Sequence, residues 1–127
     1  MTNIFISTGS FFALAGVVAR SLSSHAIHLF LTERGKLAGY NIAADYLIFH
    51  GIALILVAIL HHLFPGAGYH RAGYLFILGS LMFQGSVLMK SFFSIAPFGM
   101  VTPIGGLILM LGWAAIMFSS IFHAIRQ

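Results

Sequence analysis

Three side chains that can do chemistry stand at the start of a long apolar run. Asp45, Tyr46 and His50 offer a carboxylate, a phenol and an imidazole, and residues 51–60 that follow are apolar throughout. Tyr46 and His50 are four residues apart, so they share one face of a helix, whereas Asp45 cannot share that face with its neighbour Tyr46. Ionisable groups in a membrane segment are costly, so each of these groups needs a functional or a structural explanation.

The composition places this segment in a membrane protein. The chain has 127 residues, of which 60% are hydrophobic and only 6% are charged, against about 25% charged in a soluble domain. At roughly 20 apolar residues per membrane helix, four spans and short connections use nearly the whole length. We therefore predict an all-α fold, an up-down four-helix bundle integral to the membrane. It forms a single transmembrane domain over residues 1–127, with spans at about 3–22, 44–63, 72–91 and 101–123.

The connections carry weaker local signals. Residues 20–44 are the least hydrophobic region of the chain, and Leu37 and Tyr40 within it have helical spacing. We expect an interfacial amphipathic segment here, between the first two spans, with Thr32 as the N-cap of the following helix. Pro103 suits the first turn of the last helix. Residues typical of turns mark the later connections: Pro65, Ser94, Pro97 and Gly99.

The charged residues indicate a lipid surface rather than a nucleic acid. Six Lys and Arg face two acidic residues, giving a net charge of +4, but they are scattered along the chain and form no stripe. Such residues anchor membrane proteins at lipid headgroups. The chain has no cysteine, which excludes disulfides and thiolate metal sites. We predict a multi-pass protein of a bacterial inner membrane or an organelle membrane, in contact with lipids and other membrane subunits.

Polar residues of different spans are predicted to meet at one end of the bundle. His25 follows the first span and Thr102 opens the fourth, so up-down connectivity gives them the depth of Asp45 to His50. The structural interpretation is that these groups tie helices together and that Asp45 pairs with Arg20 or Lys90. The predicted polar cluster comprises Asp45, Gln84, Ser86 and Thr102.

The alternative interpretation is a cofactor site. His25 and His50 at matching depth could be the axial ligands of haem b, or could join Asp45 in holding copper or zinc. Tyr46 and His50 could equally bind a quinone or a lipid headgroup. The residues predicted to bind such a cofactor are His25, His50 and Tyr46; no cofactor is the default expectation.

Small residues predict close helix contacts on the third and fourth spans. A glycine leaves a groove in which a neighbouring helix can approach. The glycines with this predicted role are Gly73, Gly79 and Gly85 on the third span and Gly105, Gly106 and Gly112 on the fourth, where Trp113 follows.

Four motifs resemble a known family in the same order. They are Tyr46-Leu-Ile-Phe-His50, Phe83-Gln-Gly-Ser86, Thr102-Pro-Ile-Gly-Gly106 and Gly112-Trp113. Over about residues 13–120 the chain resembles the domain of unknown function 423, which includes eukaryotic transmembrane protein 256. The resemblance implies a four-helix membrane protein without an established activity. The chain departs from the family pattern at Asp45, where Arg is common, at Gln84, where Ser is usual, and at Leu88, where Tyr is frequent. It also departs in residues 20–24, which are bulkier and more polar than the small residues that precede the family's histidine at position 25.

These observations favour a non-enzymatic role. The chain has no phosphate-binding loop, no Gly-x-Ser-x-Gly and no His-Glu-x-x-His. We predict a non-catalytic accessory subunit packed against a larger membrane complex, such as a respiratory or oxidase assembly. Two alternatives stay open: a haem-, metal- or quinone-binding subunit, and a small oligomeric transporter or proton conductor.

Overall fold

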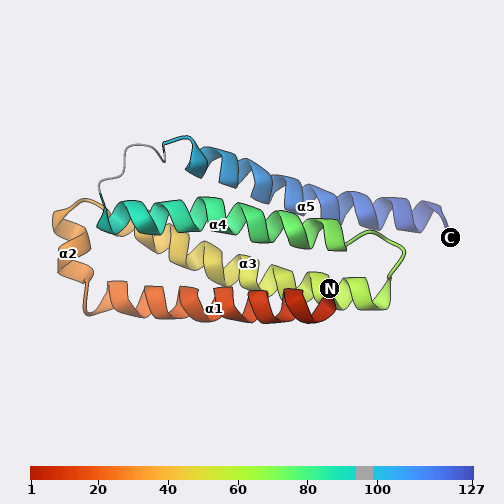
Figure 1. Cartoon of the computed structure of the whole chain (residues 1–127), viewed down its shortest axis with the longest axis horizontal. Helices are drawn as coiled ribbons and strands as arrows, with labels where there is room; N and C mark the ends of the chain where they lie inside the picture. The colour runs from red at the N-terminus through yellow and green to blue at the C-terminus, as the bar shows by residue number, and fades with distance from the viewer. Residues whose placement is uncertain (94–98) are drawn as a thin grey trace.

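Over the residues that the structure describes, the chain folds into four long helices and one short one. The computed structural model describes residues 1–93 and 99–127, and within them no strand is present (Figure 1). Four of the helices are long and apolar enough to cross a membrane, which confirms the predicted all-α membrane fold. The helices are α1 (Thr2–Ser24), α2 (His28–Glu33), α3 (Leu37–Leu63), α4 (His70–Phe92) and α5 (Val101–Ile125).

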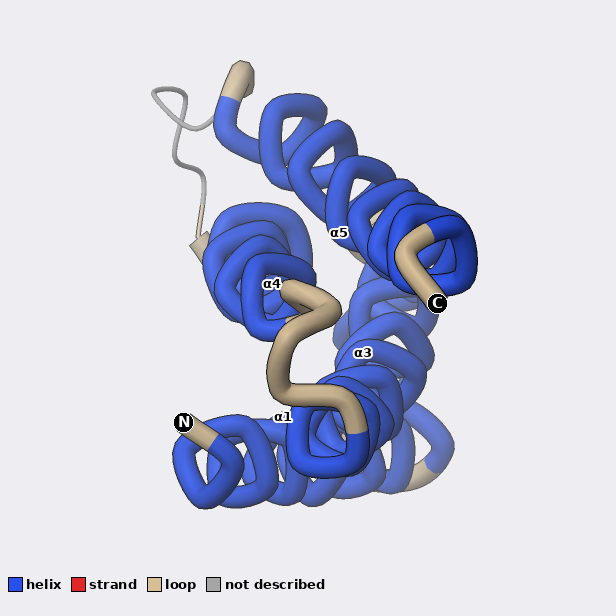
Figure 2. Tube along the Cα trace, turned by 90° about the vertical axis from the view of Figure 1, so that its right-hand side faces the viewer, coloured by secondary structure: helices blue, strands red, loops and turns tan. Residues whose placement is uncertain are grey.

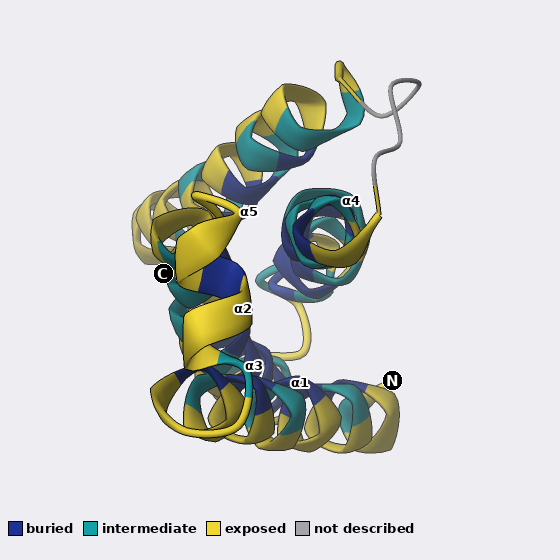
Figure 3. Ribbon diagram, turned by 90° about the vertical axis from the view of Figure 1, so that its left-hand side faces the viewer, coloured by how far each residue is buried: buried dark blue, intermediate teal, exposed yellow. Residues whose placement is uncertain are grey.

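The long helices pack in sequence order. The contacts between α1 and α3 and between α4 and α5 are extensive, and those between α3 and α4 are fewer. Figure 2 shows the resulting arrangement nearly end on, with α1 lowest and α5 outermost. The outer faces of α1 and α5 are largely exposed (Figure 3). The structure is therefore two helical hairpins joined along a seam between α3 and α4.

Glycines allow α1 and α3 to touch through their backbones. A Cβ atom built on Gly51 would lie 2.5 Å from the carbonyl oxygen of Gly9 and 2.7 Å from the amide nitrogen of Ala13. A Cβ on Gly16 would lie 2.7 Å from the carbonyl oxygen of Ala44. Two helices can come this close only where neither carries a side chain at the crossing.

The glycines of α4 and α5 divide into two groups. Gly105 packs against the backbone of Phe83, and Gly112 packs against the ring of Phe76. Gly73 and Gly79 contact side chains of other helices in the same way. Gly85 has no atom within 4 Å of a Cβ built there, so among the described residues it makes no close contact with another helix of this chain. A side chain at this position would point away from the neighbouring helices.

The connection between α1 and α3 differs in detail from the prediction. Thr32 lies inside α2, where its hydroxyl donates to the carbonyl of His28 (2.8 Å). It is not the N-cap of α3, because Gly35 with φ +64° turns the chain and Lys36 occupies the N-cap position. Pro103 lies in the first turn of α5, as expected. Ser94 and Pro97, predicted to mark a turn, lie outside the described residues.

Candidate functional site

A large concave surface lies between α3 and α5. Both helices pack on α4 but separate from each other, leaving a groove of about 680 Å³ that we call the α3–α5 groove. Among the residues that the structure describes, its lining is almost entirely apolar, and its ionisable groups are His50 and Tyr46. The lining residues are Tyr46, Phe49, His50 and Ile52 from α3, Phe83 from α4, and Gly106, Leu109, Met110 and Trp113 from α5.

His50 lies at the back of this groove with both ring nitrogens engaged. It is 5% exposed, and its Nε2 accepts a hydrogen bond from Trp113 Nε1 (3.3 Å). An indole nitrogen can only donate, so Nε2 carries no proton and the proton lies on Nδ1. Nδ1 then donates to the carbonyl oxygen of Tyr46 (2.8 Å). These two bonds hold a neutral imidazole in one tautomer and one orientation.

Gln84 is buried beside His50 but is poorly satisfied. It is fully buried, and its amide nitrogen lies 3.4 Å from His50 Nδ1, whose proton is already directed at the Tyr46 carbonyl. Gln84 Oε1 has no hydrogen-bond partner among the described residues. Rotating the amide brings Oε1 towards Nδ1 but leaves the amide NH₂ unpaired instead. Gln84 therefore contributes less to fixing His50 than Trp113 does.

The structure does not bring His25 and His50 together. His25 is the exposed C-cap of α1, and the adjacent Ser23 hydrogen-bonds to Asn41 (2.6 Å). Asn41 precedes His50 by about 14 Å along α3, at 1.5 Å per residue. The predicted matching depth is therefore wrong, because α3 begins at Leu37 and its first turns, rather than Asp45 to His50, lie opposite the end of α1.

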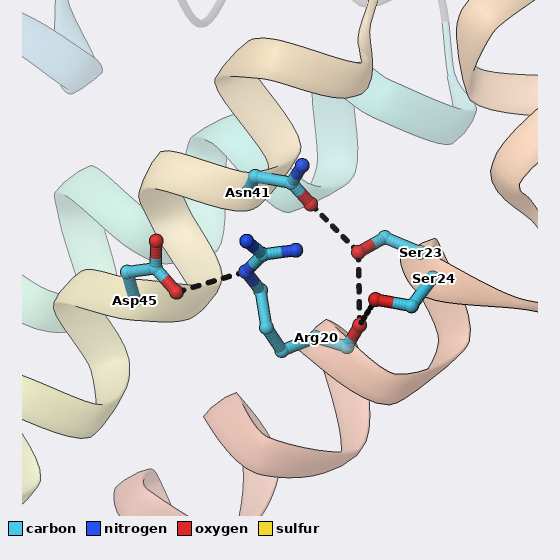
Figure 4. Close-up of polar contacts among 5 residues, drawn as sticks. All are labelled: Arg20, Ser23, Ser24, Asn41 and Asp45. Atoms are coloured by element: carbon cyan, nitrogen blue, oxygen red, sulfur yellow. Dashed lines mark hydrogen bonds and ion pairs between the residues drawn. The ribbon is translucent and has the colours of Figure 1, made fainter.

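His50 also has no free ring nitrogen with which to ligate a metal ion or a haem iron, because both nitrogens are hydrogen-bonded. Its Nε2 already accepts from Trp113, and its Nδ1 is directed at the Tyr46 carbonyl. Asp45 is directed towards α1 and Arg20 (Figure 4) rather than into the groove. Within residues 1–93 and 99–127, no group of three or more His, Cys, Asp or Glu side chains could hold a metal ion.

Asp45 instead belongs to a polar contact between α1 and α3. Arg20 Nε donates to Asp45 Oδ1 (3.0 Å), and both side chains are 42% exposed. Figure 4 shows this ion pair beside the hydrogen bond of Ser23 to Asn41. Of the two counter-charges considered for Asp45, the structure selects Arg20. The contact fixes the register of the two helices near one end of the bundle.

The other predicted counter-charge ties α4 to α5. Lys90 Nζ donates to Thr102 Oγ1 (2.8 Å), which also hydrogen-bonds to Ser86 Oγ (2.5 Å). The predicted polar cluster is therefore divided among three helix contacts.

Trp113 is the residue whose polar role was missed, because its sequence context beside Gly112 indicated packing only. Its indole N–H, the one side-chain donor that α5 presents to the groove, was the available signal.

Reversing one charge of the Arg20–Asp45 pair should destabilise the α1–α3 hairpin, and reversing both should restore it. Asp45→Arg places two guanidinium groups together, and we expect a loss of about 1 kcal/mol in the free energy of unfolding, since half-exposed pairs are worth little. The double variant Arg20→Asp/Asp45→Arg should recover most of this loss. Denaturant titration in mild detergent measures both. A double variant as unstable as Asp45→Arg would show that the pair contributes nothing.

Comparison with known proteins places the chain among membrane proteins. The family model described as "Protein of unknown function (DUF423)" matches residues 19–106, a range that contains Arg20, Asp45, His50 and Gln84 but ends before Trp113. A UPF0382 membrane protein of Staphylococcus haemolyticus is 26% identical over 92% of this chain and 94% of its own length.

Proteins of a second bacterium and of a yeast are also similar to the chain. The UPF0382 membrane protein YwdK of Bacillus subtilis is 27% identical over 93% of this chain and 96% of its own. A UPF0382 membrane protein of Schizosaccharomyces pombe is 33% identical over 83% of this chain and 93% of its own. No solved structure matches the chain.

Proposed function

Because this chain belongs to the DUF423 family of membrane proteins, whose description assigns no activity, we propose a function from the geometry: a non-catalytic subunit that receives a helix of another membrane protein in the α3–α5 groove. The single observation that carries the proposal is the groove itself, which is open and apolar and in which the His50 ring is already hydrogen-bonded to Trp113 and to the Tyr46 carbonyl. The integral membrane location and the four spanning helices are its premise.

The groove offers shape and apolar surface rather than reactive groups. His50 is satisfied by Trp113 and by the Tyr46 carbonyl, so it has no free position for a substrate or a metal. The remaining lining is aromatic or aliphatic. Membrane helices associate by close packing and not by the hydrophobic effect, and a surface of this kind supplies that packing.

Gly106 adds a point of close approach. A Cβ built on it would meet only the ring of Phe83, at 3.5 Å, so the glycine leaves space on the groove side. Small residues at such positions let a second helix backbone approach. The partner we propose is therefore a membrane helix with an apolar face and small or medium side chains. That it comes from a respiratory or oxidase assembly stays a prediction, as does the transporter alternative.

A lipid-soluble ring compound such as a quinone is the second candidate for the groove. Its volume of about 680 Å³ falls in the range typical of small-molecule sites. The rings of Tyr46 and Phe83 are stacked at 5.5 Å, and the Tyr46 hydroxyl makes no hydrogen bond within the described parts of the chain, so it could donate to a carbonyl of the compound.

Filling the groove should remove the partner without unfolding the protein. We expect Gly106→Leu to reduce the partner recovered on gentle purification by about tenfold, because a side chain there occupies the approach site. A photo-crosslinking residue at Met110, which lines the groove and is 67% exposed, should capture the same polypeptide. Placed at Leu111, 58% exposed but outside the groove, it should not.

Gly85→Leu is the matched control, because Gly85 also has free space and lies outside the groove. It should leave recovery unchanged. If Gly106→Leu abolishes recovery of a lipid-soluble ring compound instead of a polypeptide, the second candidate replaces the first. If the two leucine variants retain the same polypeptide to the same extent, the groove is not its binding site.

A further inference from the structure

A second, smaller pocket lies at the opposite end of the bundle from the Arg20–Asp45 contact. It forms where the loop between α3 and α4 meets the last turns of α5, and its volume is about 260 Å³. Unlike the α3–α5 groove it is lined by charged and polar groups as well as aromatic ones. The residues that matter here are Gly68, Arg71, Phe118, Ser119, Phe122 and Arg126.

The two arginines of this pocket have no acidic partner. The whole chain contains only two acidic side chains, Glu33 and Asp45. Asp45 is bonded to Arg20, and Glu33 ends α2, at the other end of the bundle (Figure 1). Neither Arg71 nor Arg126 forms an ion pair among the residues that the structure describes. The pocket therefore presents two guanidinium groups that form no ion pair with a carboxylate of the described residues.

Gly68 brings polar groups together on the pocket wall. Its φ of +85° favours glycine, and a Cβ built there would lie 3.8 Å from Ser119 Oγ and 4.0 Å from the Nε and Cζ atoms of Arg71. The Ser119 hydroxyl of α5 and the Arg71 guanidinium of α4 therefore both lie close to the position that a Gly68 side chain would occupy. Both are donors suited to the oxygens of a phosphate.

The pocket also lies at the ends of two candidate membrane spans, α4 and α5, the level at which lipid headgroups are found. α4 begins at His70 and α5 ends at Ile125, next to Arg71 and Arg126, so the arginines stand at the ends of two membrane spans. One and two turns before the end of α5, the exposed rings of Phe122 and Phe118 are stacked at 6.4 Å. An apolar track therefore leads from the charged pocket towards the bilayer interior.

We propose that this pocket binds the phosphate headgroup of an anionic glycerophospholipid. Arg71 and Arg126 hold the phosphate oxygens, with Ser119 as an additional donor, and the acyl chains run along Phe118 and Phe122. Arginine suits this task because its planar fork binds phosphate through two parallel hydrogen bonds. The site is independent of the α3–α5 groove and does not rest on the function proposed for it.

Native mass spectrometry of the full chain in neutral detergent tests this assignment, with phosphatidylglycerol and phosphatidylcholine as the added lipids. We expect preferential binding of phosphatidylglycerol, and a loss of that preference by about tenfold in Arg71→Gln/Arg126→Gln, since hydrogen bonds to charged groups are the strong ones. The control Arg34→Gln/Lys36→Gln removes the same charge at the other end of the bundle and should keep the preference.

Three outcomes overturn the proposal. Equal losses in the two double variants would show that anionic lipid is attracted by net charge and not held in the pocket. An undiminished preference in Arg71→Gln/Arg126→Gln would place the lipid elsewhere. Full displacement of the lipid by millimolar inorganic phosphate, in the unmutated protein, would show that the pocket takes free phosphate instead. Thermal unfolding of each variant without lipid confirms that the chains compared are folded.

Discussion

Replacing Gly51 with leucine should separate α1 from α3 and lower the free energy of unfolding by about 3 kcal/mol or more, since overpacking costs 1–3 kcal/mol even where side chains can adjust. At this position they cannot, because the first atoms met are the Gly9 carbonyl oxygen at 2.5 Å and the Ala13 amide nitrogen at 2.7 Å. Both belong to the backbone of α1, so the whole helix must move. Denaturant titration in detergent and the yield of monodisperse protein measure the loss.

A graded series makes this result specific. Gly51→Ala should already be destabilising, by roughly 1–3 kcal/mol, since the Cβ alone makes the clash. Gly85→Leu places the larger side chain on α4 where no atom lies within 4 Å, and it should change stability by less than about 1 kcal/mol. If Gly51→Leu were as stable as the unmutated chain, the backbone contact between α1 and α3 would not exist.

Replacing His50 with leucine should cost about 2 kcal/mol and change the fluorescence of the protein. The variant leaves the Trp113 N–H, which lines an apolar groove, without its acceptor, and an unpaired donor away from water costs about 1–3 kcal/mol. Trp113 is the only tryptophan of the chain, so its emission reports this one hydrogen bond. We expect a shift to shorter wavelength when the acceptor is lost, together with a lower free energy of unfolding.

Gln84→Leu is the informative comparison for that result. Gln84 is fully buried, but its amide is poorly satisfied in either orientation. Removing it should therefore be neutral or stabilising, and the emission of Trp113 should stay unchanged. Equal destabilisation by His50→Leu and Gln84→Leu would contradict the assignment of the Nδ1–H tautomer and of Trp113 as the principal partner of His50.

The helices could be predicted from the sequence because hydrophobic length decides them. Four apolar runs separated by turn residues require four spans, and the start of α5 follows from Thr102 and Pro103. The start of α3 could not be placed in the same way. The span was predicted from residue 44, with Leu37 and Tyr40 in an amphipathic opening to the same helix, whereas in the structure one continuous helix begins at Leu37.

That early start explains much of what the sequence did not reveal about the site. With α3 beginning at residue 44, His25 and His50 would stand at one depth; with α3 beginning at Leu37, Asn41 takes the place opposite Ser23. Asp45 and Tyr46 were correctly separated by the helical rotation between neighbouring residues. The partner of His50 could not be found, because the side of α4 on which α5 packs is decided by tertiary contacts such as Gly105 against Phe83.

The helices contact each other more extensively within each hairpin than between the hairpins. This difference has consequences for the synthesis and the motion of the molecule. α1 and α3 can complete their backbone contact while α4 and α5 are still being synthesised. The second hairpin then packs on the first through the less extensive contact between α3 and α4. Since α5 is carried by α4, a small rocking at the seam would widen or narrow the space in front of His50 without disturbing either hairpin. That space exists only once α5 has packed on α4.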